Sequence, residues 1–355
     1  MEAATDEMKT AAAERNAMPS GLAHGLPNHW YPILRAEELG EKPVACRRFA
    51  EDLAVWRNAA GAPRVFENHC PHRLAPLSLG KISGDELACP YHGWRFGGSG
   101  ACVSMPLEQP SPAVLARHSV KSYPAEERGG YIWMFYGRRE DVTPLQVPPE
   151  LEDTAWLAFK TEYVWKTNWI NVLDNVIDPL HAIFLHAGAV TQRKRARFKE
   201  FRITKDDDAG FRLGKLGIYE DGSVGPVEGE VEFLLPNVMR LDIANGTQQG
   251  IYRVVIMPTP IDDDTACAFY VRTRRTDGVW SRLQWRLWWA MHGRAVHAVA
   301  AQDREVLEGL GPVVEGRRKE HLAVSDTGVA RLRRRIQQAY HGEHNRPSHD
   351  SVRGR

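Results

Sequence analysis

Two short segments of the chain each carry one cysteine and one histidine. Cys70 and His72 stand in the first segment and Cys89 and His92 in the second, in the pattern C-x-H-x16-C-x2-H. This division suits a [2Fe–2S] cluster in which one iron takes the two cysteines and the other takes the two histidines. Two Cys and two His also satisfy tetrahedral Zn²⁺, but the usual zinc spacing keeps like residues together. The pattern therefore favours the cluster, with a structural zinc site as the alternative.

A second set of possible metal ligands lies downstream, where His181 and His186 are five residues apart. On a regular helix this spacing places them about 140° apart, so both can reach one metal only if the helix bends or unwinds. Pro179 provides a cause, because it removes a backbone donor and disfavours helical geometry at Asp178. Two histidines plus one carboxylate would make the facial triad of a non-haem Fe(II) site. Taken in isolation, two histidines at this spacing are more often ordinary core or surface residues.

The first ligand set belongs to a segment of short strands. Runs rich in β-branched and aromatic residues alternate there with Gly, Asp and Pro signals, which predicts a small antiparallel β domain over residues 28–136. The two ligand loops should then lie at hairpin tips. The runs are VACRRF, LAVWR, PRVFENHC and GGYIWMFYG.

The second ligand set belongs to a longer region of mixed pattern. Residues 137–154 are polar and Pro-rich and are predicted to link two domains. Beyond them, residues 155–341 combine a helical segment over 168–186, long strands over 230–276 with an acidic turn, and a helix from about 280 to 308. A broad antiparallel sheet with helices on one face is an α+β architecture. The ends, residues 1–27 and 342–355, are predicted to be a disordered arm and a disordered tail.

Composition narrows the class of protein. With 355 residues, 43% of them hydrophobic, and a net charge of +1, the chain suits a globular protein of two domains and argues against a nucleic-acid partner. Five cysteines leave three outside the ligand pattern, and these are expected to be free or buried thiols. No secretory signal or run of 18 apolar residues occurs, so we expect no membrane segment and a cytoplasmic location.

The segments CPHRLAPLSLG, LACPYHGWRF and GGSGACVSMP, together with the pattern N-x2-D-x2-H-x4-H, resemble the Rieske non-haem iron oxygenases. The resemblance extends over about residues 28–341, and implies a β-rich Rieske domain followed by a helix-grip catalytic domain. Two positions depart from the family pattern. Leu74 stands where a glycine is common, and Gln302 stands where an acidic residue is common.

The resemblance also assigns roles to particular residues. It implies that Asp303 is the third iron ligand, with Glu305 and Glu308 as the fallback candidates. It implies that Asp178 bridges an iron-ligating histidine to His92 of the partner subunit in a head-to-tail homotrimer. From the sequence alone, a helix N-cap is an equally good role for that aspartate.

Four weaker assignments concern the surroundings of the metals, the substrate and the electron donor. Asn175 stands where the family often has an amide that lines the approach to iron, and Trp94 could shield the cluster or simply pack in the core. Asn245 and Thr247 are possible polar contacts of a substrate. The basic run at residues 193–197 could dock an acidic electron donor, although such runs are usually solvated loops.

The resemblance implies an enzyme, the terminal oxygenase that uses O₂ and one mononuclear non-haem Fe(II) on an organic substrate. The chain has no G-x-G-x-x-G fingerprint, so electrons should come from NAD(P)H through a separate flavin reductase, with or without a ferredoxin. The N-x2-D spacing is similar to the vanillate, dicamba and toluenesulfonate branch, which favours a monooxygenase that hydroxylates or O- or N-dealkylates an aromatic or other cyclic compound. The alternatives are a ring-hydroxylating cis-dioxygenase, a Rieske electron-transfer protein without oxygenase activity, and a degenerate binding module.

Overall fold

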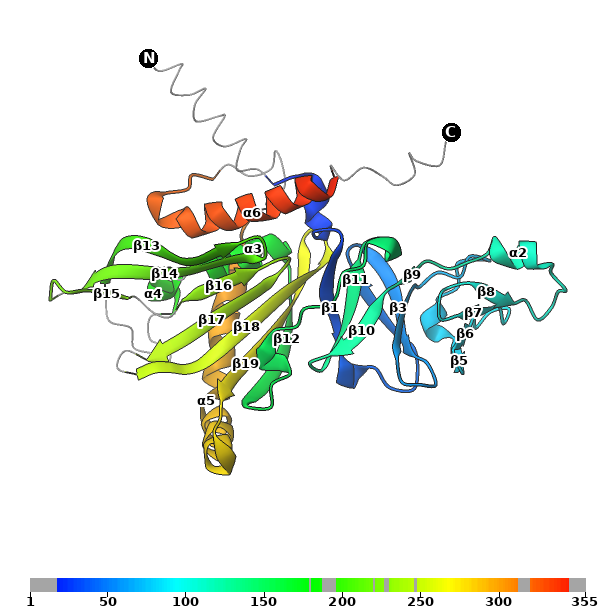
Figure 1. The fold of residues 1–355 in the computed structure, drawn as a ribbon, viewed down its shortest axis with the longest axis horizontal. Coiled ribbons are helices and arrows are strands. Elements are labelled where there is room, and N and C mark those ends of the chain that lie inside the picture. Colours follow the sequence, from blue (N-terminus) through cyan, green and yellow to red (C-terminus); the bar gives the residue numbers. More distant parts are fainter. Residues whose placement is uncertain are drawn as a thin grey trace, which may run out of the picture. The chain divides into compact units, whose positions relative to one another are not determined.

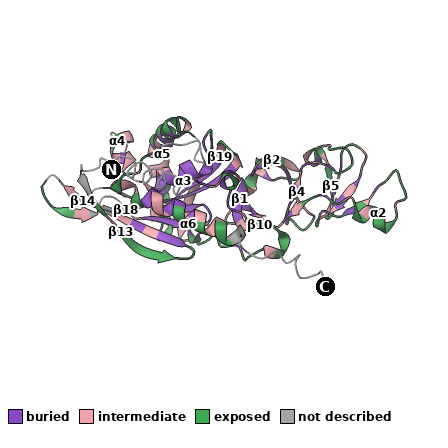
Figure 2. Cartoon of the chain, turned by 90° about the horizontal axis from the view of Figure 1, so that it is seen from above, coloured by how far each residue is buried: buried purple, intermediate pink, exposed green. Residues whose placement is uncertain are grey.

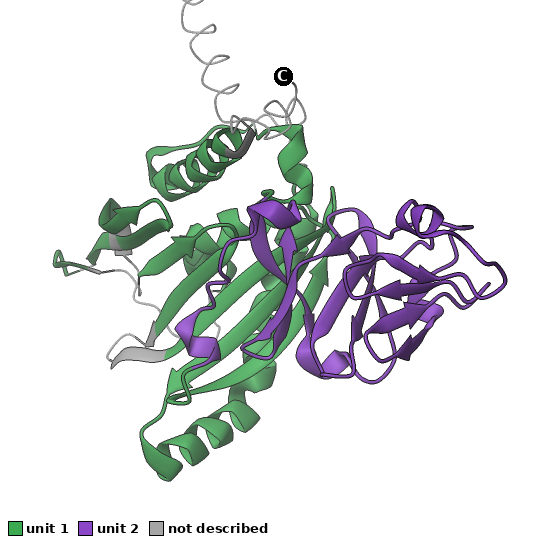
Figure 3. Ribbon diagram, turned by 45° about the vertical axis from the view of Figure 1, so that its right-hand side comes forward, with its two compact units in different colours: residues 1–27, 153–355 green, residues 28–152 purple. Residues whose placement is uncertain are grey.

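A computed structural model describes residues 18–178, 180–186, 196–219, 221–226, 230–245, 248–311 and 320–344 of the chain (Figure 1). The chain divides into two compact units, Asn28–Glu152 on the one hand and Met1–Pro27 with Asp153–Arg355 on the other (Figure 3). Each unit has its own buried apolar core. None of the described helices is long and apolar enough to cross a membrane.

The first unit is built from short antiparallel strands in three small sheets. Their orders are β1-β11-β10, β2-β3-β4-β9 and β5-β6-β7-β8. The elements are β1 (His29–Arg35), β2 (Val44–Arg48), β3 (Glu51–Arg57), β4 (Pro63–Glu67), β5 (Lys81–Ser83), β6 (Glu86–Ala88), β7 (Arg95–Gly97), β8 (Cys102–Ser104), α2 (Pro112–Ala116), β9 (Ser122–Tyr123), β10 (Ala125–Arg128) and β11 (Tyr131–Tyr136). The predicted β domain is therefore present, and β2, β3, β4 and β11 coincide with the predicted runs.

The first unit extends further along the chain than the sequence suggested. Residues up to Glu152, expected to be a linker, stay with this unit because several contacts hold them. Trp30 Nε1 donates to the Thr143 carbonyl oxygen, and Arg128 forms an ion pair with Glu152. Glu150 is buried.

The second unit is organised around one antiparallel sheet of eight described strands. The order is β12-β19-β18-β17-β16-β14-β13, with β15 paired to β14. The strands are β12 (Trp156–Trp165), β13 (Ala196–Asp207), β14 (Gly210–Tyr219), β15 (Val224–Pro226), β16 (Val231–Leu234), β17 (Val238–Asn245), β18 (Gln248–Asp262) and β19 (Thr265–Arg275). Residues 230–245 form two paired strands with a turn at Pro236, and β18 and β19 are joined by the acidic turn that the sequence indicated.

Helices cover this sheet and carry the second ligand set. They are α3 (Trp169–Ile177), α4 (His181–Leu185), α5 (Gly278–Glu308) and α6 (Thr327–His344). Asn168 caps α3 by accepting a hydrogen bond from the Ile170 N–H at 3.0 Å. Nearly every residue of α3 is buried (Figure 2), since the helix contacts strands β16 to β19 as well as α5 and α6.

Residues 18–27 correct one expectation. The sequence predicted a disordered arm over residues 1–27, but Ser20–His24 forms a 3₁₀ helix whose neighbours are fully buried in the core of the second unit. Trp169 Nε1 donates to the Leu22 carbonyl oxygen at 2.8 Å, and Met18, Leu22 and Leu26 are 0% exposed. Residues 1–17 and 345–355 lie outside the described residues, and α6 continues to His344, into the predicted tail.

Two candidate metal centres

The first candidate centre lies between two loops that share one backbone design. In the first loop the Leu74 N–H donates to the Cys70 carbonyl oxygen at 2.8 Å, and in the second the Gly93 N–H donates to the Cys89 carbonyl oxygen at 3.1 Å. Leu74 and Gly93 both take positive φ angles, 58° and 71°. Each loop thus reverses directly after its Cys–His set, and the second loop is the tip of the β6–β7 hairpin.

The four side chains divide between the interior and the surface. The thiols of Cys70 and Cys89 belong to the apolar core of the first unit and are 1% and 4% exposed. His72 and His92 lie nearer the surface, with ring centroids 4.6 Å apart, and the ring of His72 stacks on Trp94 at 4.4 Å. Trp94 therefore both packs in the core and covers one imidazole.

The atoms of this centre fit a bound cluster. Burial, with the neighbouring Cys89 thiol, raises the pKa of the Cys70 thiol to about 11, so a thiolate there needs a positive partner. His92 Nδ1 is buried and has no hydrogen-bond partner among the described residues. Two buried thiols and two imidazoles near the surface match a [2Fe–2S] cluster with its cysteine-ligated iron inside. Among the described residues, the remaining cysteines Cys46, Cys102 and Cys267 form no disulfide, and Cys102 and Cys267 are buried.

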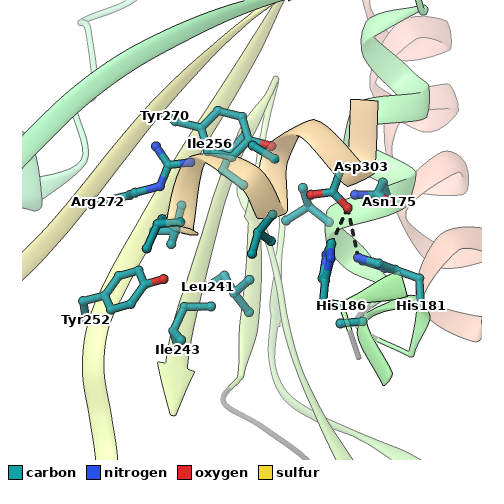
Figure 4. Close-up of a pocket in the computed structure, with 16 residues that line it drawn as sticks. Asn175, His181, His186, Leu241, Ile243, Tyr252, Ile256, Tyr270, Arg272 and Asp303 are labelled. Atoms are coloured by element: carbon teal, nitrogen blue, oxygen red, sulfur yellow. Dashed lines mark ion pairs between the residues drawn. The ribbon is translucent and has the colours of Figure 1, made fainter. Parts of the chain in front are cut away.

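The second candidate centre joins both ends of α4 to α5. His181 is the first residue of α4, His186 directly follows it, and Asp303 lies on α5. Their ligand atoms all lie within 4.8 Å of one another. Both Nε2 atoms face the same oxygen, Asp303 Oδ1, at 3.4 Å for His181 and 3.2 Å for His186 (Figure 4). The helical segment is interrupted between Ile177 and His181, as the spacing of the two histidines required, and Pro179 itself lies outside the described residues.

Hydrogen bonds fix which nitrogen of each imidazole faces Asp303. His181 Nδ1 donates to the Asp178 carbonyl oxygen, and His186 Nδ1 donates to Gln302 Oε1 at 2.9 Å. An imidazole whose Nδ1 carries the proton presents a free lone pair at Nε2, which is the form that binds metals. Sequence analysis noted Gln302 only as a departure from a pattern, and missed that it orients His186.

Asp303 is the carboxylate best placed for a metal. Burial by itself raises the pKa of this carboxyl group, but the two imidazoles outweigh that effect and hold the pKa well below its usual range. The fallback residues are placed differently. Glu305 is exposed, and Glu308 accepts a hydrogen bond from the Lys166 N–H at 3.0 Å. Two imidazoles and one buried carboxylate around one point fit a divalent iron with open positions.

Asp178 contacts His181 differently from the way its sequence position suggested. Its backbone carbonyl, rather than its carboxylate, meets the imidazole. Its Oδ1 accepts a hydrogen bond from the Leu180 N–H at 2.9 Å, an Asx-type turn between the end of α3 and the start of α4.

A pocket of about 650 Å³, counting its mouth, opens beside the three ligand side chains (Figure 4). Its wall is mostly aliphatic and comes from α3, α4, α5 and strands β17 to β19. Asn175 lines it, as expected, and so do Tyr252, Tyr270 and Arg272, which the sequence analysis did not single out. The side chains of Asn245, Thr247 and the basic run at residues 193–197 lie outside what the structure describes.

Comparisons with known proteins agree on both units. A family described as Rieske [2Fe-2S] domain matches residues 29–124, and one described as vanillate O-demethylase oxygenase C-terminal domain matches residues 165–341. Among curated proteins, the chain is 28% identical to the 5,5'-dehydrodivanillate O-demethylase oxygenase subunit of Sphingobium sp. (strain NBRC 103272 / SYK-6), over 92% of this chain and 79% of the relative. It is 26% identical to the 3-chlorobenzoate-3,4-dioxygenase oxygenase subunit of Comamonas testosteroni, over 88% and 83%.

A solved structure has the same fold. The crystal structure of dicamba monooxygenase bound to dicamba superposes with a TM-score of 0.70 at 23% sequence identity, over 90% of this chain and 98% of the other.

Proposed function

This chain belongs to the Rieske non-haem iron oxygenases, as a terminal oxygenase subunit of the vanillate O-demethylase type, and from that membership we propose that it is a monooxygenase. It would hydroxylate, or O- or N-dealkylate, an aromatic or other cyclic compound. The observation that carries the proposal is the position of the His–His–Asp set in the wall of a pocket lined mostly by aliphatic side chains, the kind of site in which small organic compounds bind.

Two sets of residues would hold the metals. Cys70, His72, Cys89 and His92 would bind the cluster, and His181, His186 and Asp303 would bind one mononuclear iron. When bound, these groups supply single electrons and a place to activate O₂. The chain's own contribution is orientation and exclusion of water. Gln302 and the Asp178 carbonyl hold the imidazoles, the aliphatic wall keeps bulk water from the reacting carbon, and Asn175 offers an amide beside the ligands.

Asp178 has a proposed role between subunits. In a homotrimer it would connect His181 to His92 of the partner subunit, and so join a cluster in one chain to an iron in the next. The partly exposed carboxylate of Asp178 supports this role, and so does His92 Nε2 on a ring that lies near the surface.

The electrons would come from NAD(P)H through a separate flavin reductase, directly or by way of a ferredoxin, and we propose a cytoplasmic location. For a methoxy substrate the balance is ArOCH₃ + O₂ + NAD(P)H + H⁺ → ArOH + HCHO + H₂O + NAD(P)⁺. The name of the first relative, an O-demethylase, supports this reaction. The name of the second, a dioxygenase, favours cis-dihydroxylation as the alternative, in which both oxygen atoms enter one product.

Turnover with a panel of methoxy-aromatic, N-methyl and polycyclic compounds tests the proposal. With a generic reductase supplied, a dealkylating monooxygenase releases one formaldehyde for each NADH and each O₂ consumed, whereas a dioxygenase releases a cis-diol and no formaldehyde. NADH oxidation that no compound of the panel stimulates would contradict both.

Three variants test the ligand assignment. His181→Ala and Asp303→Ala should lose the mononuclear iron and keep the visible spectrum of the cluster. Asp178→Asn should keep both metals and lose turnover. Retention of three irons per chain in His181→Ala, or normal activity in Asp178→Asn, would show that the assignment is wrong.

A further inference from the structure

A buried arginine forms part of the pocket wall. Arg272 lies on β19, two residues after Tyr270 on the same face of the sheet, and is 2% exposed. Figure 4 shows its guanidinium on the side of the pocket away from His181, His186 and Asp303.

Every contact of this guanidinium is with a neutral group. It donates to Thr161 Oγ1 at 2.8 Å and to the Tyr163 hydroxyl at 3.3 Å. Aromatic rings surround it, with its central carbon 5.0 Å from the ring centroid of Tyr270 and 5.9 Å from that of Trp289. Within the part of the chain that the structure describes, Arg272 forms no ion pair. By contrast Arg333, which is equally buried, has Asp174 and Glu320 as partners.

A buried cation without an anion is costly, so its presence needs a reason. An arginine carries five N–H donors, and protein acceptors take up two of those on Arg272. Its charge is strongly attractive in an apolar wall, because little water screens it. The ligand set on the opposite side of the pocket contains a single carboxylate, Asp303. With a divalent metal bound, its net charge would be positive, so it would not neutralise Arg272.

We propose that Arg272 is a specificity-determining residue that binds a carboxylate group of the substrate, so that the enzyme acts on cyclic or aromatic acids. A planar guanidinium matches a carboxylate through two parallel hydrogen bonds, and the three unused donors are available for them. The acid would lie with its carboxylate at Arg272 and its reacting substituent toward His181, His186 and Asp303. This inference rests on the proposed function, because it takes the same pocket as the substrate site.

Tyr270 is a second polar group in this part of the pocket wall, beside Arg272. Burial raises the pKa of its hydroxyl well above the usual value, so the tyrosine stays neutral and can donate a hydrogen bond.

Binding of matched acids and amides tests the proposal without any turnover. The probes are 3,4-dimethoxybenzoate, other methoxybenzoates and cyclohexanecarboxylate, each paired with its primary amide, titrated calorimetrically into the anaerobic holoenzyme. At least one acid should bind about 10- to 100-fold more tightly than its amide. In Arg272→Met this preference should fall to nearly one with the amide affinity unchanged, and Arg272→Lys should keep part of it. If no acid in the panel is preferred over its amide, the proposal is wrong.

Two controls separate a binding role from a structural one. Arg253 alternates with the pocket residues Tyr252 and Val254 on β18 and pairs with Asp242, so Arg253→Met should leave the preference intact. Loss of acid and amide binding alike in Arg272→Met, with a lower unfolding temperature, would mean that the arginine only braces the sheet. A preference for acids without oxidation of any of them would contradict the proposed function and leave this inference standing.

Discussion

At the scale of single residues, the side-chain amide of Gln302 determines which nitrogen of His186 is free to bind a metal. Gln302 Oε1 accepts a hydrogen bond from His186 Nδ1 at 2.9 Å, which leaves Nε2 facing Asp303. A partner of this kind is worth about 10- to 100-fold in metal affinity. We therefore expect Gln302→Leu to lose mononuclear iron at a chelator concentration that leaves the wild type loaded.

The matched variant is Gln302→Glu, which keeps an acceptor and restores the residue type that the family pattern favours at this position. It should retain iron nearly as well as the wild type. Iron content per chain after dialysis against chelator, with the visible spectrum as a measure of the intact cluster, checks both variants. Full iron in Gln302→Leu would show that the amide does not orient His186.

Leu74 offers a test in the other unit. It holds a φ of 58° and is 67% exposed, and a side chain in this left-handed region costs about 1–2 kcal/mol. Glycine relieves that cost but gains freedom in the unfolded chain, so Leu74→Gly should stabilise the first unit by roughly 0.5–1 kcal/mol. Urea unfolding, followed by the visible absorption of the cluster, measures the change. Leu74→Ala keeps the strained backbone and should show no comparable gain.

Candidate ligands could be recognised from the sequence where they lie close together along the chain. Cys70, His72, Cys89 and His92 stand on two short loops, so their spacing alone indicated a metal site. Arg272 could not be singled out in the same way. It lies in the run RTRR, where Arg274 and Arg275 are exposed, and only its position along β19, beside the pocket, distinguishes Arg272 from them.

At the scale of elements, a buried ion-pair group ties α3 to α6. Arg333 of α6 donates to Asp174 of α3 at 2.6 Å and also pairs with Glu320. Asp174 lies one turn before Asp178, so this contact holds the end of α3, which precedes the iron-ligand candidate His181. Removing one member leaves buried charge without its partner, which typically costs 3–5 kcal/mol.

We therefore expect Arg333→Met to destabilise the second unit by about 3–5 kcal/mol. Thermal unfolding followed by release of mononuclear iron measures it. The exposed neighbour on the same helix supplies the control, since Arg334→Met should change stability by less than about 0.5 kcal/mol. If the Asp174→Leu and Arg333→Met double variant is no more stable than Arg333→Met alone, the isolated charge is not the cause.

Element boundaries were only partly readable from the sequence. The helix predicted near residues 280–308 is α5, because its length and aromatic spacing identify it. In the sequence, residues 230–245 look like one continuous apolar strand. In the structure a turn at Pro236 divides them into β16 and β17. The neighbouring Asn237 side chain donates to the Pro258 carbonyl oxygen at 2.9 Å. Such a long-range contact has no signal in local sequence.

At the scale of the whole molecule, the second unit is assembled from two separate stretches of chain. Met18, Leu22 and Leu26 have too few apolar neighbours to suggest a packed segment, and sequence analysis left them in a disordered arm. In the structure they complete the core that also contains Trp169 and Ile336. Their burial is a property of the assembled unit, so no local pattern could have predicted it.

Leu22→Ala tests this arrangement. Because Leu22 is 0% exposed, its truncation should cost the second unit about 2–5 kcal/mol through lost burial and a cavity. The transition that releases mononuclear iron should move to lower temperature, while bleaching of the cluster in residues 28–152 should not. Equal shifts of both transitions would show that the units do not unfold independently. Leu107, which is 79% exposed in the first unit, provides a neutral leucine-to-alanine control.

The discontinuous second unit has a consequence for biosynthesis. The proposed cluster ligands fall within residues 70–92 of a unit that is continuous in sequence, so a cluster could be inserted into that unit on a nascent chain. Asp303 leaves the ribosome 303 − 92 = 211 residues after His92, which is about 10–40 s later at common translation rates. Leu22 is made before the strands and helices that bury it, and its core is complete only after α6 has been made. The direction of translation therefore allows the proposed cluster to be inserted well before the proposed mononuclear iron site has been made.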